Sequence, residues 1–141
     1  MNIKKTRYSH YNLNYHLVWI PKYRRRILTG EIATRLSELL QETAERNDIE
    51  ILSESIQSDH IHLFVSAPPR LSPSSIVNIF KGFTGRQLRK EFPSLLKHHR
   101  ERVWTRTYYI GTAGSVSTET IQSYIQGQED ARRDVHQGVK N

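Results

Sequence analysis

Two short β-type runs joined by only a few residues constrain the fold of this chain more than any other feature. Residues 49–56 and 60–67 contain β-branched and aromatic side chains, and only residues 57–59 separate them. Such a short connection predicts an antiparallel hairpin. From Ile61 to Val65 the apolar residues occupy alternate positions, so the second strand should turn one face toward a core and the other away from it.

A strand and a helix are expected before this hairpin. Residues 12–20 form an aromatic and β-branched run that ends at Pro21, which suits a buried strand. Residues 31–46 then place apolar side chains at helical spacing, with Gly30 before the run and Asn47 after it. The first half of the chain is therefore predicted to be β-α-β-β.

A second helix and a fourth strand are expected after the hairpin. Ser72 and Pro73 give the preferred start of a helix, a capping residue followed by proline at the first helical position. The apolar stripe continues to about Phe92, and Pro93 then ends the helix. Residues 102–110 are again aromatic and β-branched, which predicts a strand.

A last helix is expected to carry Tyr124. Ser117 or Thr118 can cap it, and a flexible, glycine-containing link over residues 111–114 precedes it. The order β-α-β-β-α-β-α folds most simply as an α+β domain with a ferredoxin-like, RRM-like four-stranded antiparallel sheet. Two helices would cover one face of the sheet, and the last helix would be free to pack elsewhere.

Length and composition narrow the function. The chain of 141 residues fits one domain over residues 1–141, with residues 134–141 as a loosely ordered tail. It has 21 Lys and Arg against 14 Asp and Glu, a net charge of +7 that favours nucleic acid over an acidic membrane surface. No run approaches the roughly 18 apolar residues of a spanning helix, and no signal peptide is seen, so we expect a cytoplasmic protein. The absence of cysteine excludes disulfides, thiolate metal sites and cysteine nucleophiles.

Four side chains can assemble a metal-activated tyrosine. His60 and His62 flank one apolar residue and should project from the same face of a strand. Tyr124 and Gln128 lie four positions apart and should be neighbours on a helix. Two imidazoles and one amide oxygen make a three-ligand metal site with open positions, and a phenol beside it could attack what the metal polarises. A phosphodiester is the natural substrate, which points to cutting and joining DNA.

The histidine pair alone is a weak motif. With seven histidines in 141 residues, chance alone gives about 0.3 His-x-His tripeptides. Two imidazoles on a solvated sheet face, satisfied by water and by Asp59, are the plain alternative. Their position favours function, because the alternating apolar residues of the strand would hold both rings rigidly.

Tyr124 also has a purely structural interpretation, because an aromatic residue at helical spacing with Ile121 and Ile125 can simply pack. Against this, Gln128 is not a core residue. Gly127 costs a helix about 1 kcal/mol relative to alanine, which suggests that a ligand or another backbone approaches there. Two tyrosines of the expected fourth strand are the competing candidates, Tyr108 and Tyr109.

Two clusters of basic residues are candidates for DNA contact, although solvated charge is the plain alternative. The first cluster includes an aromatic residue, a combination that single-stranded nucleic acid uses for stacking and phosphate contact. Its members are Lys22, Tyr23, Arg24, Arg25 and Arg26. The second cluster, on the expected second helix, comprises Lys81, Arg86 and Arg89. His16 on the first strand is a further candidate neighbour of the DNA.

Longer segments resemble a known family. His60-Ile61-His62 is similar to the HUH signature, in which U is a bulky apolar residue. The segment YIQGQ, which ends at Gln128, resembles the nucleophile helix of the single-tyrosine HUH transposases, which belong to insertion sequences that move as single-stranded DNA. Four segments resemble the family in its own order: YHLVWIPKYRR at 15–25, SDHIHLFVSAPP at 58–69, FKGFTGRQLRK at 80–90 and VWTRTYYIGTAG at 103–114.

The resemblance implies a role for each site residue. His60, His62 and Gln128 would hold a divalent metal, Mg²⁺ or Mn²⁺, and Tyr124 would be the nucleophile. It also implies a homodimer with composite active sites, in which the tyrosine helix of one subunit serves the histidine pair of the other. The substrates would be single-stranded element ends with imperfect hairpins, and a short guide sequence in the DNA would help to choose the cleavage site.

Attack by Tyr124 is expected to give a 5′-phosphotyrosine and a free 3′-hydroxyl, which conserves bond energy so that strands can rejoin without ATP. One alternative is a non-catalytic module that binds RNA or single-stranded DNA on the same type of sheet, and it predicts binding without a covalent product. Another is a hydrolase that uses metal-bound water, and it predicts cleavage without Tyr124. A domesticated relative that cuts genomic hairpins would carry the same site.

Overall fold

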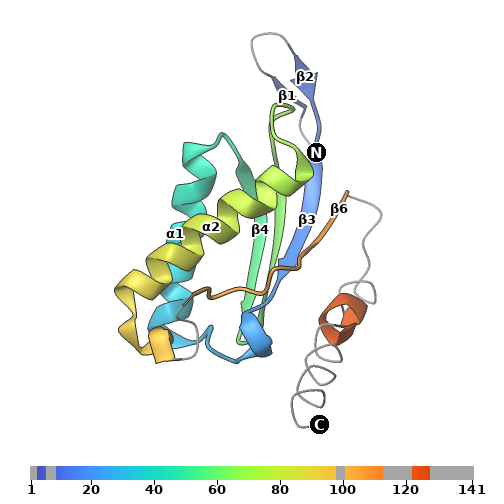
Figure 1. Ribbon diagram of the computed structural model, residues 1–141. Helices are drawn as coiled ribbons and strands as arrows, with labels where there is room; N and C mark the ends of the chain where they lie inside the picture. Colours follow the sequence, from blue (N-terminus) through green and yellow to red (C-terminus); the bar gives the residue numbers. More distant parts are fainter. Residues whose placement is uncertain (1–2, 6–8, 98–100, 113–121, 128–141) are drawn as a thin grey trace.

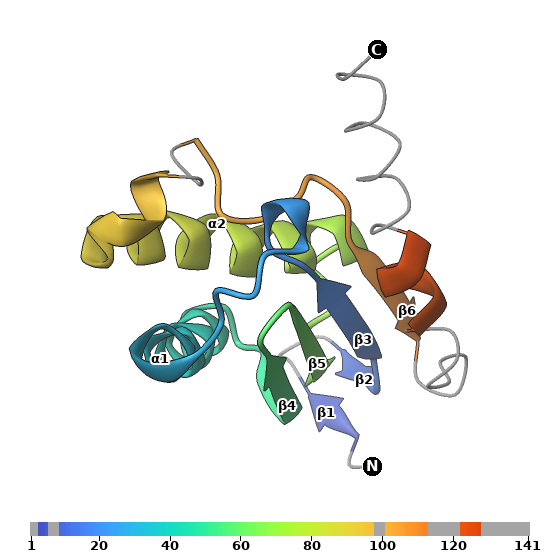
Figure 2. The same cartoon turned by 90° about the horizontal axis from the view of Figure 1, so that it is seen from below.

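A four-stranded antiparallel sheet with two long helices on one side forms the body of the protein (Figure 1). The computed structural model describes residues 3–5, 9–97, 101–112 and 122–127. The strands of the main sheet are β3 (Asn14–Trp19), β4 (Glu50–Gln57), β5 (His60–Ser66) and β6 (Tyr109–Thr112). The helices are α1 (Gly30–Arg46) and α2 (Pro73–Glu91). Seen from below, both helices lie on the same side of the sheet (Figure 2).

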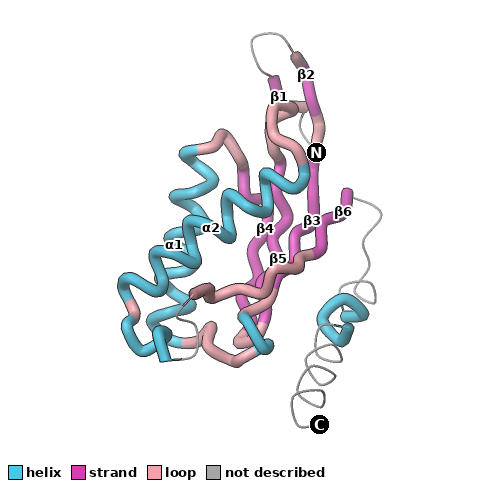
Figure 3. The backbone as a smooth tube through the Cα atoms, in the orientation of Figure 1, coloured by secondary structure: helices cyan, strands magenta, loops and turns pink. Residues whose placement is uncertain are grey.

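The strand order is β4-β5-β3-β6, and every neighbouring pair is antiparallel. This order follows from a β-α-β-β-α-β chain whose first and third strands are central, as in ferredoxin-like sheets. Figure 3 shows β4, β5 and β3 running alongside one another beneath α1 and α2. The predicted α+β fold class is confirmed.

The core lies between the sheet and the two helices. From β5, Ile61, Leu63 and Val65 are fully buried, as the alternation predicted. They pack in one cluster with side chains from the other elements, including Leu17, Trp19, Leu36, Leu39, Leu40, Phe80 and Leu88. Because strand side chains alternate, the remaining residues of β5 face the other side of the sheet.

Both helices start and end close to the predicted positions. In α2, the Ser72 hydroxyl accepts a hydrogen bond from the Ser75 amide, and Pro73 is the first helical residue. The helix ends at Glu91, two residues before Pro93. At the end of α1, the Asn47 amide donates to the Ala44 carbonyl.

Shorter elements connect these parts. A two-stranded sheet of β1 (Lys4–Lys5) and β2 (His10–Tyr11), which no sequence pattern predicted, precedes β3. The 3₁₀ turns are η1 (Lys22–Arg24), after β3, and η2 (Pro93–Lys97), after α2. The β4–β5 connection is tighter than predicted, because Gln57 already pairs with His60.

The prediction of a fourth strand over residues 102–110 was wrong for most of its length, because β6 begins only at Tyr109. Val103 and Trp104 are buried, but they pair with the chain beyond the end of β3, where Trp104 forms an isolated bridge with Pro21. Proline has no N–H to donate, so a regular ladder cannot continue through that point. Aromatic and β-branched composition therefore agreed with burial at Val103 and Trp104, but it did not predict the backbone geometry of this segment.

The predicted flexible link over residues 111–114 was also wrong in its first half. Gly111 and Thr112 belong to β6 and pair with His16 and Tyr15 of β3. The C-terminal segment is helical over residues 122–127, as predicted. The proposed caps Ser117 and Thr118, the ligand Gln128 and the tail 134–141 lie outside the described residues. Within the described part of the chain, no helix is long and apolar enough to cross a membrane.

Candidate active site

His60 and His62 project from the face of the sheet that α1 and α2 leave uncovered. They alternate along β5 with Ile61, whose side chain is fully buried on the helix side. His62 lies opposite Val18 of β3 and Ser55 of β4, so it occupies the middle of the sheet. The strand that carries both histidines is therefore held in place by the core on the helix side of the sheet.

A chain of hydrogen bonds from Arg24 through Asp59, called the relay below, orients His60. Its Nδ1 atom lies 2.9 Å from Oδ1 of Asp59, and Oδ2 of Asp59 accepts a hydrogen bond of 2.9 Å from Nε of Arg24. Burial would raise the pKa of Asp59, but the His60 hydrogen bond and the Arg24 charge outweigh it, so the pKa lies below its usual value. An ionised Asp59 accepts from Nδ1 and leaves Nε2 of His60 as a lone-pair donor.

A neutral partner orients His62. Nε2 of His62 lies 2.9 Å from Nδ1 of His16 on β3, and the His16 ring stacks on Phe64 with centroids 4.3 Å apart. Burial lowers the pKa of His62, and the charges of His16 and His60 lower it further. Burial also lowers the pKa of His16. Both rings are therefore neutral at pH 7, the form in which imidazole binds a metal.

The donor set fits a divalent metal in part. Two imidazoles on one face, one of them hydrogen-bonded to a carboxylate through its other ring nitrogen, are the arrangement found around metal-binding histidines. Among the described residues, no group of three His, Asp or Glu side chains could hold a metal ion. A metal held by this pair would therefore need a third protein ligand of another type or from outside the described residues, and Gln128 is the candidate that the sequence predicts.

Tyr124 lies in the helical segment 122–127, and its hydroxyl is turned toward β6. The Tyr124 hydroxyl is 3.3 Å from the hydroxyl of Thr107, and its ring centroid is 6.3 Å from that of Tyr109. Burial raises the pKa of Tyr124, and hydrogen bonds to Thr107 and Thr105 offset part of that rise. In this conformation the phenol is protonated at neutral pH.

Within one chain, Tyr124 contacts Tyr109 of β6, whereas the histidine pair lies on β5, two strands away. His62 and Tyr109 both lie opposite Val18, on either side of β3, so two strand spacings, about 10 Å, separate their backbones. An open cavity of about 800 Å³ lies between the helical segment and the site. It is lined by Arg24, His60, Gln122, Ser123, Ile125, Gln126 and Gly127. Tyr124 is not among these described lining residues.

The first basic cluster adjoins the histidine pair. Tyr23 and Arg24 have positive φ angles of 61° and 51°, an uncommon backbone for residues other than glycine. This turn lets Lys22 and Arg25 lie over the Tyr23 ring. It also directs Arg24 to Asp59, while Arg26 donates to Ser58 at 3.3 Å. Arg24, which the sequence predicted as a DNA contact, therefore also holds Asp59 and through it His60.

The second basic cluster lies on the other side of the sheet. Lys81, Arg86 and Arg89 are on α2, away from the face that carries His60 and His62. Lys81 donates to the carbonyl oxygens of Thr105 and Thr107 at 2.7 and 3.1 Å. It therefore braces the segment whose Thr107 hydroxyl meets the tyrosine.

Three supporting side chains were missed or undervalued by sequence reasoning. Asp59 was expected only as a partner for solvated imidazoles, although a carboxylate directly before His60 is a usable signal. His16 was expected only as a neighbour of DNA, but its alternate position on a central strand could have placed it beside His62. Thr107 carries no sequence signal, because its role depends on where the last helix lies.

Comparison with known proteins agrees with this architecture. The model of the family described as "Transposase IS200 like" matches residues 9–128. The ISDra2 transposase TnpA of Deinococcus radiodurans is 34% identical over 92% of this chain and 94% of its own length. The transposase for insertion sequence element IS200 of Salmonella typhimurium is 34% identical over 89% of this chain and 82% of its own length.

Solved structures share the fold. A crystal structure of a protein assigned as a transposase from Deinococcus radiodurans R1 superposes with a TM-score of 0.82 at 32% identity, covering 89% of this chain and 97% of that chain. A REP-associated tyrosine transposase bound to a REP hairpin gives a TM-score of 0.55 at 15% identity, covering 86% and 67%. The family model and the relatives span nearly the whole sequence, and the chain belongs to the IS200-like transposase family.

Proposed function

We propose that this transposase cuts and rejoins single-stranded DNA at element ends that carry hairpins, with Tyr124 as the nucleophile. The reaction needs a divalent metal, Mg²⁺ or Mn²⁺, and no ATP. His60, His62 and Gln128 hold the metal. The relatives that are named as transposases of insertion sequences support the reaction class.

The relay from Arg24 through Asp59 to His60 is the observation that carries the proposal. A solvated surface histidine does not need a largely buried carboxylate that is itself held by an arginine. Such a relay fixes one tautomer and one ring orientation, which is the usual requirement of a metal ligand. It supports a metal role for the histidine pair more strongly than the tripeptide does.

The proposed step is a transesterification. The Tyr124 oxygen attacks the scissile phosphorus, and its phenolic proton passes to solvent. The bond from phosphorus to the 3′-oxygen breaks, and the 3′-oxygen takes a proton from solvent. The products are a 5′-phosphotyrosine and a strand with a free 3′-hydroxyl. A second 3′-hydroxyl reverses the step and joins the strands, because the phosphotyrosine keeps the energy of the original ester.

The bound metal would polarise the phosphate and neutralise the developing negative charge. The surrounding protein contributes orientation. Asp59 holds the His60 ring, and His16 holds the His62 ring. Because all three proposed ligands are uncharged, the site keeps its positive charge directed toward phosphate oxygens, and metal affinity should be modest.

We propose that hairpin-bearing DNA is the substrate and that the active site is composite in a homodimer. The REP-associated transposase with the same fold was solved bound to a REP hairpin. Within one chain, the Tyr124 hydroxyl meets Thr107 near the far edge of the sheet from β4. A tyrosine helix delivered by a second subunit would close that separation without disturbing β5.

The direct test uses purified protein, labelled single-stranded oligonucleotides with the ends that flank its gene, and Mn²⁺ or Mg²⁺. Denaturing gels should show a covalent protein–DNA band that requires metal and disappears in Tyr124→Phe. Tyr108→Phe is the matched control, because it removes a phenolic hydroxyl from a residue that packs on the core and beside Lys81. A band that survives in Tyr124→Phe would overturn the mechanism.

The composite site has its own test. Tyr124→Phe keeps the histidine pair, and His60→Ala keeps the tyrosine, so each variant alone should be inactive. If the tyrosine acts in the partner subunit, mixing the two variants should restore a covalent band on the His60→Ala chain. Failure to complement, with mixed dimers verified by mass spectrometry, would place the tyrosine in its own subunit's site.

One observation favours the non-catalytic alternative. His16 and Phe64 stack on the two central strands of the open sheet face, where RRM-like sheets present aromatic rings to bases. This alternative predicts that Phe64→Ala abolishes DNA binding and that no metal produces a covalent band. Under the transposase proposal, the band forms and only its yield depends on Phe64.

A further inference from the structure

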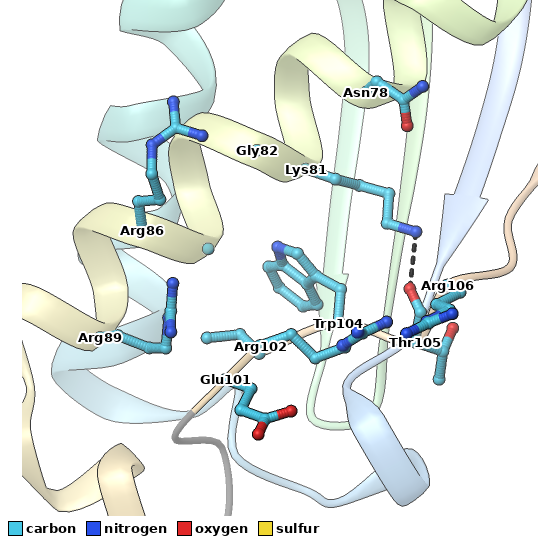
Figure 4. A pocket seen from close by; sticks show the side chains of 12 residues that line it. Asn78, Lys81, Gly82, Arg86, Arg89, Glu101, Arg102, Trp104, Thr105 and Arg106 are labelled. Atoms are coloured by element: carbon cyan, nitrogen blue, oxygen red, sulfur yellow. Dashed lines mark hydrogen bonds between the residues drawn. The ribbon is translucent and has the colours of Figure 1, made fainter.

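Lys81 lies in a groove between α2 and the segment 101–106 (Figure 4). The groove has a volume of about 530 Å³ and shares no lining residue with the cavity beside His60. Besides Lys81 and the carboxylate of Glu101, its charged residues are four arginines: Arg86, Arg89, Arg102 and Arg106. A concave surface with an excess of one charge attracts ions of the opposite charge. The groove therefore offers a small anion several guanidinium groups beside one amine.

Two backbone carbonyls hold the amine of Lys81. Its Nζ atom donates to the carbonyl oxygens of Thr105 and Thr107 at 2.7 and 3.1 Å. It also lies 5.5 Å from the centre of the Tyr108 ring. A deprotonated amine still has the two N–H groups that these carbonyls accept, and it gains a lone pair. The same contacts can therefore hold Lys81 as a nucleophile.

The surroundings of Lys81 favour the free amine. Burial, and then the charge of Arg102, lower the pKa of Lys81 to about 8. With this pKa, about a quarter of Lys81 is free amine at pH 7.5, against roughly one in a thousand for an ordinary lysine. Desolvation and a neighbouring cation are the usual means of activating an amine nucleophile. Conversion to a neutral amide would also remove the repulsion between Lys81 and Arg102.

The arginines suit an acyl donor that carries a phosphate group. Guanidinium groups match phosphate oxygens with paired hydrogen bonds. In Figure 4, Arg102 and Arg106 lie at the end of the groove where the Lys81 amine meets Thr105. In an acyl phosphate the carbonyl carbon is joined directly to a phosphate oxygen. A phosphate bound by these arginines would therefore bring the acyl carbon to the amine.

We infer that Lys81 is an acylation site for acyl phosphates that bind to the arginines of this groove. The Lys81 ammonium group first loses a proton to solvent, and the free amine attacks the acyl carbon. The bond from that carbon to the phosphate oxygen breaks, and an amide forms at Nζ. The nitrogen loses a second proton, which the departing phosphate takes up. The products are acyl-lysine and inorganic phosphate.

Acylation weakens the support of the segment on which Tyr124 docks. The amide has no charge and keeps one N–H, so it can hold only one of the carbonyls of Thr105 and Thr107. The Thr107 hydroxyl lies 3.3 Å from the Tyr124 hydroxyl. The acyl transfer itself is independent of the proposed function, whereas its consequence for the nucleophile rests on that function.

The first test maps the modified lysines by mass spectrometry. The full chain is incubated with acetyl phosphate at pH 7.5, without DNA or metal. Lys81 should be acetylated about tenfold faster than Lys90, an exposed lysine of the same helix, because the gain in free amine exceeds the loss of basicity. Added inorganic phosphate should slow the reaction at Lys81 and leave Lys90 unchanged. Equal rates at the two lysines would overturn the assignment.

Arg106→Gln separates phosphate binding from the reactivity of the amine. Arg106 is exposed, so its replacement should leave the fold intact. Acetylation of Lys81 by acetyl phosphate should slow several-fold, whereas acetylation by uncharged acetic anhydride should be unchanged. Arg70→Gln removes another exposed arginine and should alter neither reaction. Equal slowing of both reactions by Arg106→Gln, or no slowing of either, would rule out donor binding by the arginines.

The consequence for Tyr124 is measured by NMR titration of ¹³Cζ-tyrosine. Burial raises the pKa of Tyr124 in the docked helix. In Lys81→Gln, which has the neutral amide of the acylated side chain, this pKa should fall toward its ordinary value. Lys81→Arg keeps the charge and should stay closer to the wild type. An unchanged Tyr124 pKa in Lys81→Gln would refute the effect on docking. None of these assays uses DNA, metal or cleavage, so their failure and that of the covalent-band test are distinguishable.

Discussion

The histidine pair and the tyrosine helix differ in how the rest of the molecule holds them. The pair sits on a central strand whose Ile61, Leu63 and Val65 are fully buried, and each ring has its own polar partner. The helical segment 122–127 meets the sheet through the Tyr124 side chain and buries one other residue, Ile125. The fold itself therefore builds the proposed metal-binding half of the site, whereas the segment with the proposed nucleophile docks on the sheet through few side chains.

This difference suits the proposed exchange of DNA strands. A metal site loses affinity when its ligands move, so its ligands belong on a rigid strand. A nucleophile that stays covalently joined to DNA must be able to carry that DNA from one partner strand to another. A helical segment that can leave its docking position on the sheet allows the tyrosine to move without unfolding the domain.

The comparison predicts that truncating a buried aliphatic side chain to alanine destabilises the protein more on β5 than on the helical segment 122–127. Leu63→Ala should lower the free energy of unfolding by about 2–5 kcal/mol, because a fully buried side chain on a central strand leaves a cavity that cannot collapse. Ile125→Ala should lower it by no more than about 1 kcal/mol, because a weakly docked helix opens before the domain unfolds. Urea unfolding followed by circular dichroism measures both, and equal losses would show that the helix belongs to the same cooperative unit.

The relay to His60 can be broken without disturbing the core. Asp59→Asn removes the carboxylate charge that fixes His60 and pairs with Arg24. Metal affinity should fall by about 10- to 100-fold, the usual cost of losing such a partner. Calorimetric titration with Mn²⁺ measures the change.

Asp48→Asn is the control for the Asp59 variant. Asp48 also pairs with an arginine, Arg70, but that pair is exposed. Asp48 precedes β4 and so lies at the opposite end of that strand from Gln57, which pairs with His60. It should leave the Mn²⁺ affinity unchanged. Unaltered Mn²⁺ affinity in Asp59→Asn, or an equal loss in both variants, would show that Asp59 does not support metal binding by His60.

His16 is expected to position His62 as Asp59 positions His60, and substitutions of His16 test this role. His16→Phe keeps a ring that can stack on Phe64 but removes the hydrogen bond to His62, and Mn²⁺ affinity should fall by about tenfold. His16→Gln can restore a hydrogen bond and should recover most of the affinity. If the phenylalanine variant binds Mn²⁺ as tightly as the wild type, His16 has no part in positioning His62.

Local sequence patterns were sufficient for the rigid half of the molecule. Alternation in residues 60–66 identified the hairpin, the buried face and the shared face of the two histidines, because a strand fixes side-chain direction with a period of two. The start of α2 could also be predicted from adjacent residues, since Ser72 and Pro73 determine where this helix begins. The α+β topology then followed from the order of the elements.

Contacts between distant segments could not be predicted from such patterns. Residues 102–108 have the composition of a strand, yet their backbone pairs at Pro21, where a ladder cannot continue. The direction of Tyr124 toward Thr107 depends on how the last helix docks, which no spacing within that helix encodes. The partners Asp59 and His16 were visible as residues, but only the register of β3 on β5 brings His16 to His62.

The smallest expected effect tests whether Tyr124 docks on β6 in solution. The Thr107 hydroxyl favours the ionised phenol, so Thr107→Val should move the pKa of Tyr124 further above its ordinary value. Because the folded pKa is already raised above 10, docking is fully favourable below about pH 10 and is lost as pH rises through the folded pKa. Titration of ¹³Cζ-tyrosine by NMR follows the change.

Thr105→Val provides the graded control for this titration. Its hydrogen bond lowers the pKa of Tyr124 less than that of Thr107 does, so its removal should raise the pKa by a smaller amount. The cost to helix docking should be about 0.5–1.5 kcal/mol for Thr107→Val, the usual net value of one hydrogen bond. A Tyr124 pKa near 10 in the wild type, unmoved by either variant, would mean that the phenol is solvated and that the nucleophile is already undocked.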